Sequence, residues 1–197
     1  MALVLASGSK IRAELMKNAG LVFETDPSDV DERAVEEPLL KANFPPEDLA
    51  SVLAEAKAND VSSRRASDLV VGADQILAFE GERRTKPEDM EAARRQLLAF
   101  SGKVHELHAS VVISRGGEAI WRNVSTARLK MRDLSPAYVG HYLANAGESV
   151  LSSVGAYQLE GLGVQLFEKI DGDYFTILGL PMLPLLAELR ALGVIET

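Results

Sequence analysis

The chain has no cysteine among its 197 residues, and this absence excludes several kinds of chemistry. It forms no disulfide, holds no metal through thiolates and has no cysteine nucleophile, in keeping with a reducing compartment. Long apolar runs are also missing, and the opening Met-Ala-Leu-Val-Leu lacks the basic region that starts a secretory signal. We therefore expect a cytoplasmic protein that is not bound to a membrane.

Positive charge is scarce as well. The chain carries 21 Lys and Arg against 29 Asp and Glu, which gives a net charge of −8. A protein that binds the backbone of nucleic acids needs a basic face, so we expect no nucleic-acid partner. A small phosphate ligand is not excluded, because it needs only a few converging cations and a Mg²⁺ held by carboxylates.

What is present is typical of a compact α/β enzyme. Apolar residues make up 47% and charged residues 25%, and a chain of this length buries a full core as one domain or one domain with two lobes. Strand and helix patterns alternate, which predicts a mixed, twisted sheet. Alternating segments on either side of Gly116-Gly117, from Lys103 to about Leu129, predict a long central hairpin. Helices are expected at 9–18, 47–65, 88–100, 134–145 and in a last segment that ends near 192, short strands at 21–23 and 164–167, and an acidic loop at 26–37.

The opening segment predicts a strand, a short loop and a helix start. Leu3 begins an apolar run that breaks at Ser7-Gly8-Ser9 and continues into a helical pattern with Lys10 and Arg12. Free backbone N–H groups, the helix dipole and nearby Ser and Arg donors suit a phosphate at such a turn. The same pattern also describes an ordinary helix start capped by Ser9.

Further ionic residues lie where elements begin or end. Asp74 ends an apolar strand, and Lys57 lies beside the apolar stripe of a long helix. Cleavage of a phosphoanhydride needs carboxylates to hold Mg²⁺ and orient water, and cations to neutralise phosphate oxygens. Each residue taken singly also has a structural interpretation as a cap, a turn former or a solvated charge. The candidates are Ser7, Ser9, Arg12, Glu32, Lys57, Asp74 and Lys86.

Several ordered motifs together carry a family resemblance over essentially the whole chain. They are Ala6-Ser-Gly-Ser9, Asp31-Glu32, Ala54-Glu-Ala-Lys57-Ala58, Gly72-Ala-Asp-Gln75, Lys86-Pro87, Ser101-Gly-Lys-Val-His105, Val154-Gly-Ala-Tyr157, Glu160-Gly161 and Gly179-Leu-Pro181. In this order and spacing, the motifs resemble those of the Maf family of nucleoside triphosphate pyrophosphatases.

The resemblance implies a fold, a reaction and roles for the candidate residues. It implies a single domain over residues 1–197, with two lobes around a cleft as in inosine triphosphate pyrophosphatases. The implied activity is a hydrolase that cleaves nucleoside triphosphates to monophosphate and pyrophosphate with Mg²⁺ or Mn²⁺ and removes non-standard nucleotides. A homodimer is left open. The implied roles are Asp74 as proton acceptor and metal neighbour, Glu32 as metal ligand, Lys57 and Lys86 toward phosphates, and Ser7, Ser9 and Arg12 as the phosphate-facing loop.

Departures from the family pattern bear on activity and substrate. Ser9-Lys-Ile-Arg12 stands where the family usually has Ser-Pro-Arg-Arg, and Ser152-Ser-Val-Gly155 lacks an acidic-basic pair. The lysine offers a point charge where an arginine would offer a planar guanidinium with several donors, so phosphate binding or the rate of catalysis could be lower. A catalytically weak nucleotide-binding regulator of cell division is therefore an alternative function. Gln75 and the segment Glu160–Gly163 resemble the subgroup that acts on 7-methyl-GTP, with the dTTP/UTP subgroup as the alternative. Gln75 and Gln158 are either base readers or hydrogen-bond partners of the protein's own backbone.

Two other interpretations follow from single residue types. The three histidines, His105, His108 and His141, are expected to be structural or exposed, because none has suitably spaced metal-ligand neighbours. Tyr157 either stacks on a base or lies in the core. A third class of function, an interaction protein that uses its acidic surface, predicts no nucleotide binding.

Overall fold

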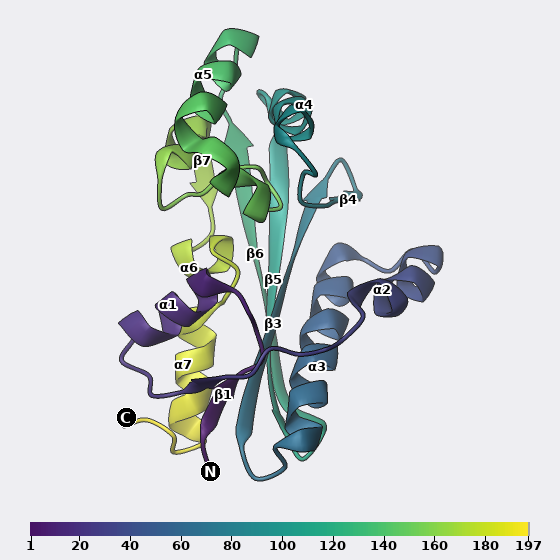
Figure 1. Ribbon diagram of the computed structural model, residues 1–197, viewed down its shortest axis with the longest axis vertical. Helices are drawn as coiled ribbons and strands as arrows, with labels where there is room; N and C mark the ends of the chain where they lie inside the picture. Colours follow the sequence, from purple (N-terminus) through teal and green to yellow (C-terminus); the bar gives the residue numbers. More distant parts are fainter. Residues whose placement is uncertain (197) are drawn as a thin grey trace. The chain divides into compact units, whose positions relative to one another are not determined.

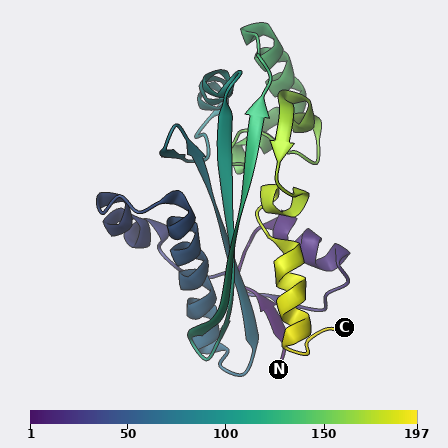
Figure 2. The same ribbon diagram turned by 180° about the vertical axis from the view of Figure 1, so that it is seen from behind.

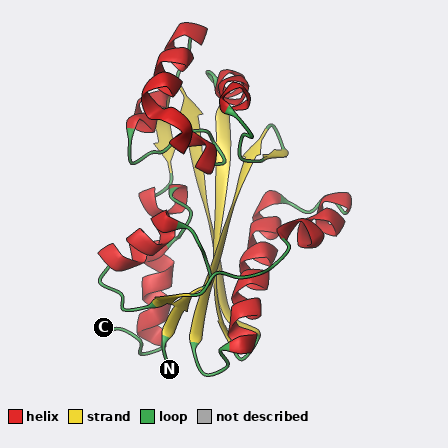
Figure 3. Ribbon diagram, in the orientation of Figure 1, coloured by secondary structure: helices red, strands yellow, loops and turns green. Residues whose placement is uncertain are grey.

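The computed structural model describes residues 1–196 and has a mixed α/β architecture, as the sequence predicts (Figure 3). Its sheet has seven strands in the order β2-β1-β3-β5-β6-β7, with β4 paired to β3. β1 is parallel to β2 and β3, whereas β4 and β7 are antiparallel to their neighbours. The strands are β1 (Leu3–Leu5), β2 (Glu24–Thr25), β3 (Leu69–Phe79), β4 (Glu82–Arg84), β5 (Val104–Arg115), β6 (Glu118–Met131) and β7 (Phe167–Asp171).

Side-chain caps define the starts of several helices. The side chains of Ser9, Asp31, Asp89 and Ser135 each accept a hydrogen bond from a backbone N–H in the first turn. No helix within residues 1–196 is both long and apolar enough to cross a membrane. The helices are α1 (Lys10–Asn18), α2 (Glu32–Lys41), α3 (Pro46–Arg64), α4 (Met90–Phe100), α5 (Pro136–Ala146), α6 (Tyr174–Ile177) and α7 (Met182–Ala191), with 3₁₀ turns η1 (Gly147–Ser152) and η2 (Leu162–Leu166).

The chain divides into two compact units. Unit 1 comprises residues 1–75, 108–125 and the chain from 174 onward, and unit 2 comprises residues 76–107 and 126–173. Strands β3, β5 and β6 therefore each contribute residues to both units. The predicted central hairpin is confirmed as β5 and β6, which are neighbours in the sheet and are joined by the turn at Gly116-Gly117.

Unit 1 is built on the buried strands β1 and β3. Helices α3 and α7 flank its part of the sheet on opposite sides (Figures 1 and 2). Val4, Val61 and Val70 form one fully buried cluster, so apolar residues of two parallel strands meet the last turns of α3. Burial of this kind contributes roughly 1.5–3 kcal/mol for each large aliphatic side chain.

The core of unit 2 contains a cluster of aromatic rings. The ring centroids of Phe79 and Phe100 lie 4.8 Å apart, and those of Tyr157 and Phe167 lie 4.9 Å apart, both edge to face. The ring of His105 stacks on Phe100 with a centroid separation of 4.8 Å. These pairs join β3 and the start of β5 to α4, and the loop after η1 to β7.

Three short elements differ from the sequence predictions. The strand expected at 21–23 is displaced to β2, because the backbone N–H of Leu21 donates to Met16 at the end of α1. The strand expected at 164–167 is instead the 3₁₀ turn η2 followed by β7, since a short apolar run cannot distinguish the two. The acidic loop expected at 26–37 ends early, because Asp31 caps α2 at Glu32.

Candidate active site

A buried lysine joins two carboxylates in unit 1. The Nζ atom of Lys57 lies 2.5 Å from Oδ1 of Asp74 and 2.8 Å from Oε1 of Glu32. Lys57 and Asp74 are 8% and 7% exposed, whereas the Glu32 side chain is 53% exposed. The three residues come from α3, β3 and the first turn of α2. We call this group the Lys57 centre.

Close packing of α3 on β3 explains why Lys57 reaches Asp74. A Cβ atom at Gly72 would overlap the carbonyl oxygen of Ala54 and would lie 2.7 Å from the Cβ of Ala58, so only glycine allows this approach. Asp74 lies two residues after Gly72 and therefore on the same face of the strand. Lys57 directly precedes Ala58 on the helix, so the same contact brings the two charges together.

The Lys57 centre is stable only as a group. A charge removed from water is costly unless it is paired and hydrogen-bonded, and here the ammonium is shared by two carboxylates. Loss of either Lys57 or Asp74 would leave the other charge buried with less compensation. The group carries a net negative charge and has one more exposed member, Glu32, that a cation or solvent can reach.

Arg12 connects the first loop to the strand residue before Asp74 and to the turn at Gly179. Its Nη1 atom donates to the carbonyl of Ala73 at 2.7 Å and to Oγ of Ser7 at 3.4 Å, and its Nε atom donates to the carbonyl of Gly179 at 2.9 Å. Burial lowers the pKa of Arg12, while the charges of Asp74 and Glu32 oppose this shift. An arginine stays protonated despite such a shift, so the site keeps its guanidinium cation.

The serines of the first loop organise the start of α1. Oγ of Ser7 accepts the backbone N–H of Ser9 at 3.2 Å, and Oγ of Ser9 accepts the backbone N–H of Arg12 at 3.5 Å. The structure thus has the capping arrangement that the sequence allowed. The phosphate-facing role of the loop stays a prediction.

Gln75 contacts the protein's own backbone. Its Nε2 atom donates to the carbonyls of Thr176 at 3.0 Å and Ile177 at 2.9 Å. Together with Arg12, it therefore fastens α6 and the turn at Gly179 to the strand on both sides of Asp74. A role of Gln75 in base recognition stays a prediction.

The sequence of this chain matches the family described as Maf-like protein over residues 2–192. The chain belongs to the Maf family. It is 59% identical over 188 residues to the "7-methyl-GTP pyrophosphatase" of Brucella suis biovar 1 (strain 1330), which covers 95% of this chain and 94% of the relative. It is 56% identical over 194 residues to the protein of that name from Mesorhizobium japonicum, with 98% of both chains covered. The resemblance inferred from the motifs is thereby confirmed.

More distant relatives extend the same pattern. The "Nucleoside triphosphate pyrophosphatase" of Ruegeria pomeroyi is 45% identical over 195 residues, with 99% of this chain and 98% of the relative covered. Among solved structures, a HAM1 protein from Coxiella burnetii is 14% identical, with a TM-score of 0.39 over 66% of this chain and 72% of that chain. That structural similarity is too low to support an argument.

Two of the predicted site residues of this Maf-family chain lie in unit 2. Lys86 is exposed in the segment between β4 and α4, directly before the buried Pro87. Gln158 is partly exposed, and its side chain exchanges hydrogen bonds with Ser149, whose Oγ donates to Oε1 at 3.2 Å and whose carbonyl accepts Nε2 at 3.4 Å. The participation of both residues in the site stays a prediction.

The acidic residues of the Lys57 centre fit a divalent cation that is held jointly with phosphate. Within residues 1–196 no group of three or more His, Asp or Glu side chains is arranged to hold a metal by itself. Mg²⁺ typically needs only one or two carboxylates when waters and substrate phosphates complete its oxygen shell. Asp74 and Glu32, which flank Lys57, supply that number of hard oxygen donors.

Sequence reasoning missed a set of ionic residues next to this centre. Asp26, Asp60 and Arg64 form ion pairs in unit 1, and no motif singled them out. A signal was present, because Lys57, Asp60 and Arg64 follow one another at helical spacing and so lie on one face of α3. Charges on a helix are usually solvated, which is why this spacing alone did not indicate a site.

Proposed function

We propose that this Maf-family chain hydrolyses nucleoside triphosphates between the α- and β-phosphates, with a modified nucleotide such as 7-methyl-GTP as its substrate. The single observation that carries the proposal is the Lys57 centre, a buried ammonium held between Asp74 and Glu32. The names of the Brucella suis and Mesorhizobium japonicum relatives support the choice of nucleotide. The dTTP/UTP preference is the alternative substrate within the same reaction.

The residues of the centre divide the chemistry between them. Asp74 accepts the proton of the attacking water or orients that water toward phosphorus, and Lys57 neutralises phosphate oxygens. Asp74 and Glu32 would hold Mg²⁺ or Mn²⁺, which when bound offsets phosphate charge. One P–O bond of the Pα–O–Pβ bridge breaks, and the bridging oxygen stays with one of the two phosphorus atoms. The oxygen of the attacking water bonds to the other phosphorus atom. Lys86, Ser7, Ser9 and Arg12 are assigned to the phosphates, and Gln75 and Gln158 to the base.

A second candidate is a nucleotide-binding protein with little turnover. It is favoured by Arg12, whose Nε and Nη1 atoms donate to backbone carbonyls and to Ser7. An arginine committed in this way has fewer donors to offer a phosphate. The altered motif around Lys10 points in the same direction.

The deciding experiment is pyrophosphate release from 7-methyl-GTP, dTTP, UTP and ITP, with Mg²⁺ or Mn²⁺. We expect turnover of 7-methyl-GTP by the natural protein and a loss of at least a hundredfold in Asp74→Asn, because the amide can neither take the proton nor compensate Lys57. Asp48→Asn, at the exposed start of α3, is the matched control and should keep full activity. Nucleotide binding without turnover in the natural protein would favour the second candidate instead.

A further inference from the structure

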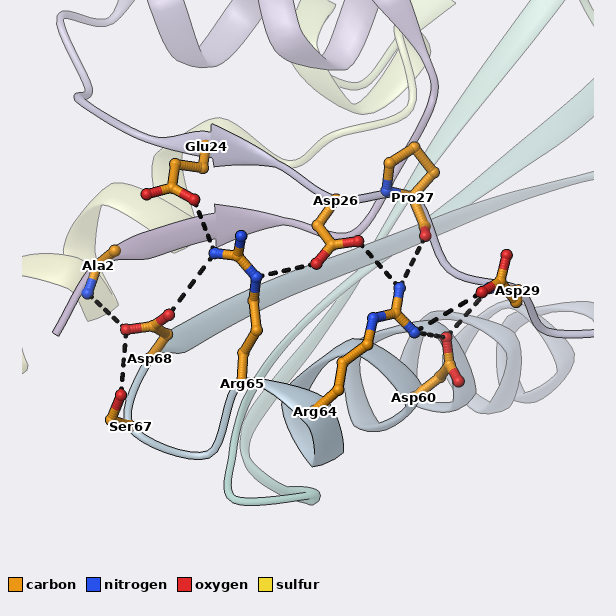
Figure 4. A network of polar contacts seen from close by, with 10 residues as sticks. All are labelled: Ala2, Glu24, Asp26, Pro27, Asp29, Asp60, Arg64, Arg65, Ser67 and Asp68. Atoms are coloured by element: carbon orange, nitrogen blue, oxygen red, sulfur yellow. Dashed lines mark hydrogen bonds and ion pairs between the residues drawn. The ribbon is translucent and has the colours of Figure 1, made fainter.

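The chain from Asp26 to Glu32 lies along one face of α3 and contacts it at three successive places. Arg64 Nη2 donates to Oδ1 of Asp26 and to the carbonyl of Pro27, both at 3.0 Å (Figure 4). The backbone N–H of Asp29 donates to Oδ2 of Asp60 at 3.1 Å. Glu32 then meets Lys57 at 2.8 Å. As the residue number along the segment rises from 26 to 32, the residue number of the contacted side chain on α3 falls from 64 to 57.

The spacing of these contacts follows the helix. Lys57, Asp60 and Arg64 are three and four residues apart, so they line one face of α3 over about two turns, or roughly 10 Å. The facing segment 26–31 has no helix or strand of its own. Its two ends have further contacts: Asp26 donates its N–H to the carbonyl of Leu5 and pairs with Arg65, and Asp31 accepts the N–H of Ala34 in α2. Between these ends, side chains of α3 hold the segment at Pro27 and Asp29.

Arg64 holds two successive residues at the start of the segment, and Arg65 adds an ion pair from its Nε atom to Oδ2 of Asp26 at 2.9 Å. The Arg64 guanidinium donates to Asp26 and Pro27 through Nη2, and to Oδ2 of Asp60 through Nη1 at 3.0 Å. Asp60 in turn accepts the N–H of Asp29, so Arg64 also orients the second contact. A planar fork can serve three acceptors at once, whereas a lysine offers one nitrogen. The hydrogen bond from Arg64 also lowers the pKa of Asp26, so this carboxylate stays charged at neutral pH.

We propose that Arg64 is a positioning residue that fixes the segment 26–31 against α3 and thereby delivers the carboxylate of Glu32 to Lys57 beside Asp74. Only two residues, Val30 and Asp31, lie between Asp29 and Glu32, so the anchored segment leaves α2 little freedom at its first turn. Arg64 touches neither substrate nor metal in this role. The inference rests on the proposed function only for its consequence in catalysis, because the placement of Glu32 is a property of the chain itself.

The test combines Arg64→Ala and Arg64→Lys with Glu32→Gln. If Arg64 acts through Glu32, we expect Arg64→Ala to raise the Mg²⁺ concentration for half-maximal pyrophosphate release by roughly 10–100-fold, the range for residues that orient metal ligands. Arg64→Lys should recover only part of this. The double variant Arg64→Ala/Glu32→Gln should be no worse than Glu32→Gln alone, because the two changes remove one effect. Independent, multiplied effects would overturn the proposal.

Arg122→Ala is the matched control. Arg122 forms a bidentate ion pair with Glu55 of α3, from Nε to Oε2 at 2.6 Å and from Nη2 to Oε1 at 2.7 Å. It does not contact the segment 26–31. Hydrogen exchange supplies a readout that does not need turnover: Arg64→Ala should speed exchange at residues 29–36, and Arg122→Ala should not. If the natural protein turns over no nucleotide, the proposed function fails while exchange still decides the positioning role. Unchanged exchange in Arg64→Ala, or faster exchange with an unchanged Mg²⁺ requirement in an active protein, overturns the inference.

Discussion

At the scale of single residues, burial determines the protonation state of His105 in unit 2. The side chain is 1% exposed, its Nε2 atom lies 2.7 Å from the hydroxyl of Tyr157, and its ring stacks on Phe100. Burial lowers the pKa of His105 from 6.5 to about 4, and burial raises the pKa of Tyr157. Both groups are therefore neutral at physiological pH. This agrees with the expectation that His105 is structural, and of the two interpretations of Tyr157 it favours a place in the core.

We expect His105 to make the protein less stable in mild acid. Its pKa is lower in the folded than in the unfolded chain, so between pH 6.5 and about 4 the unfolded chain binds the proton more readily and stability falls as pH falls. From pH 7 to pH 5 this amounts to about 2 kcal/mol. Urea unfolding at both pH values should show a smaller acid loss in His105→Gln than in the natural protein. The exposed His141→Gln is the control, and an equal loss in all three proteins would contradict the assignment.

At the scale of elements, the contact between α3 and β3 determines the geometry of the Lys57 centre. The contact depends on Gly72 facing Ala54 and Ala58, with no side chain between the strand and the helix. The same helix then uses its polar face to hold the segment before α2, through Asp60 and Arg64. Helix α3 thus carries Lys57 and contacts both the strand of Asp74 and the segment that precedes Glu32.

Gly72→Ala is expected to cost about 1–3 kcal/mol or more of folding stability and to lower activity. The new Cβ would overlap the Ala54 carbonyl, so α3 must shift and Lys57 moves relative to Asp74. Chemical denaturation and the pyrophosphate assay measure the two effects. Gly140→Ala, in the exposed part of α5 with nothing within 4 Å of its Cβ, should instead stabilise by about 0.5–1 kcal/mol. Equal stability changes in the two variants would refute the packing argument.

At the scale of the whole molecule, an acidic protein is proposed to bind an anionic nucleotide. The net charge of −8 opposes a general attraction for polyanions, so binding has to come from the local cations and from a divalent metal. Ligand binding to the folded chain alone stabilises it by mass action. The coupling between metal and nucleotide is therefore measurable in the stability of the entire chain.

We expect the unhydrolysable α,β-methylene analogue of 7-methyl-GTP and Mg²⁺ to raise the melting temperature together. At a concentration of about 100 times Kd the stabilisation is about 2.7 kcal/mol, or roughly 5–10 °C for a chain of this size. The analogue alone should give a much smaller shift, because its phosphate charge then faces the carboxylates of Asp74 and Glu32. Scanning calorimetry measures each shift. An acidic interaction protein without a nucleotide site would show none.

Much of the fold could be predicted because its signals are local. The cap at Ser9, the buried strand that leads to Asp74, and the hairpin around Gly116-Gly117 each depend on a few neighbouring residues. The expected end of that strand at Asp74 is wrong, because β3 continues to Phe79 and Asp74 lies inside it. The short elements β2 and β7 were misplaced, since runs of three or four apolar residues carry no period that distinguishes a strand from a turn. The ordered motifs also placed the chain in its family, which the comparison with known proteins confirms.

The sequence by itself determined the types of the long elements, the charge, the family and a set of candidate residues. Only the tertiary structure decided that Lys57 shares its ammonium with Glu32 and Asp74, and that Gln75 donates to carbonyls about a hundred residues further along the chain. The positioning contacts of Arg64 belong to the same class. The physical reason is that these contacts join segments whose proximity depends on strand order and on the close approach of helix and sheet at Gly72, and neither is encoded in a local pattern.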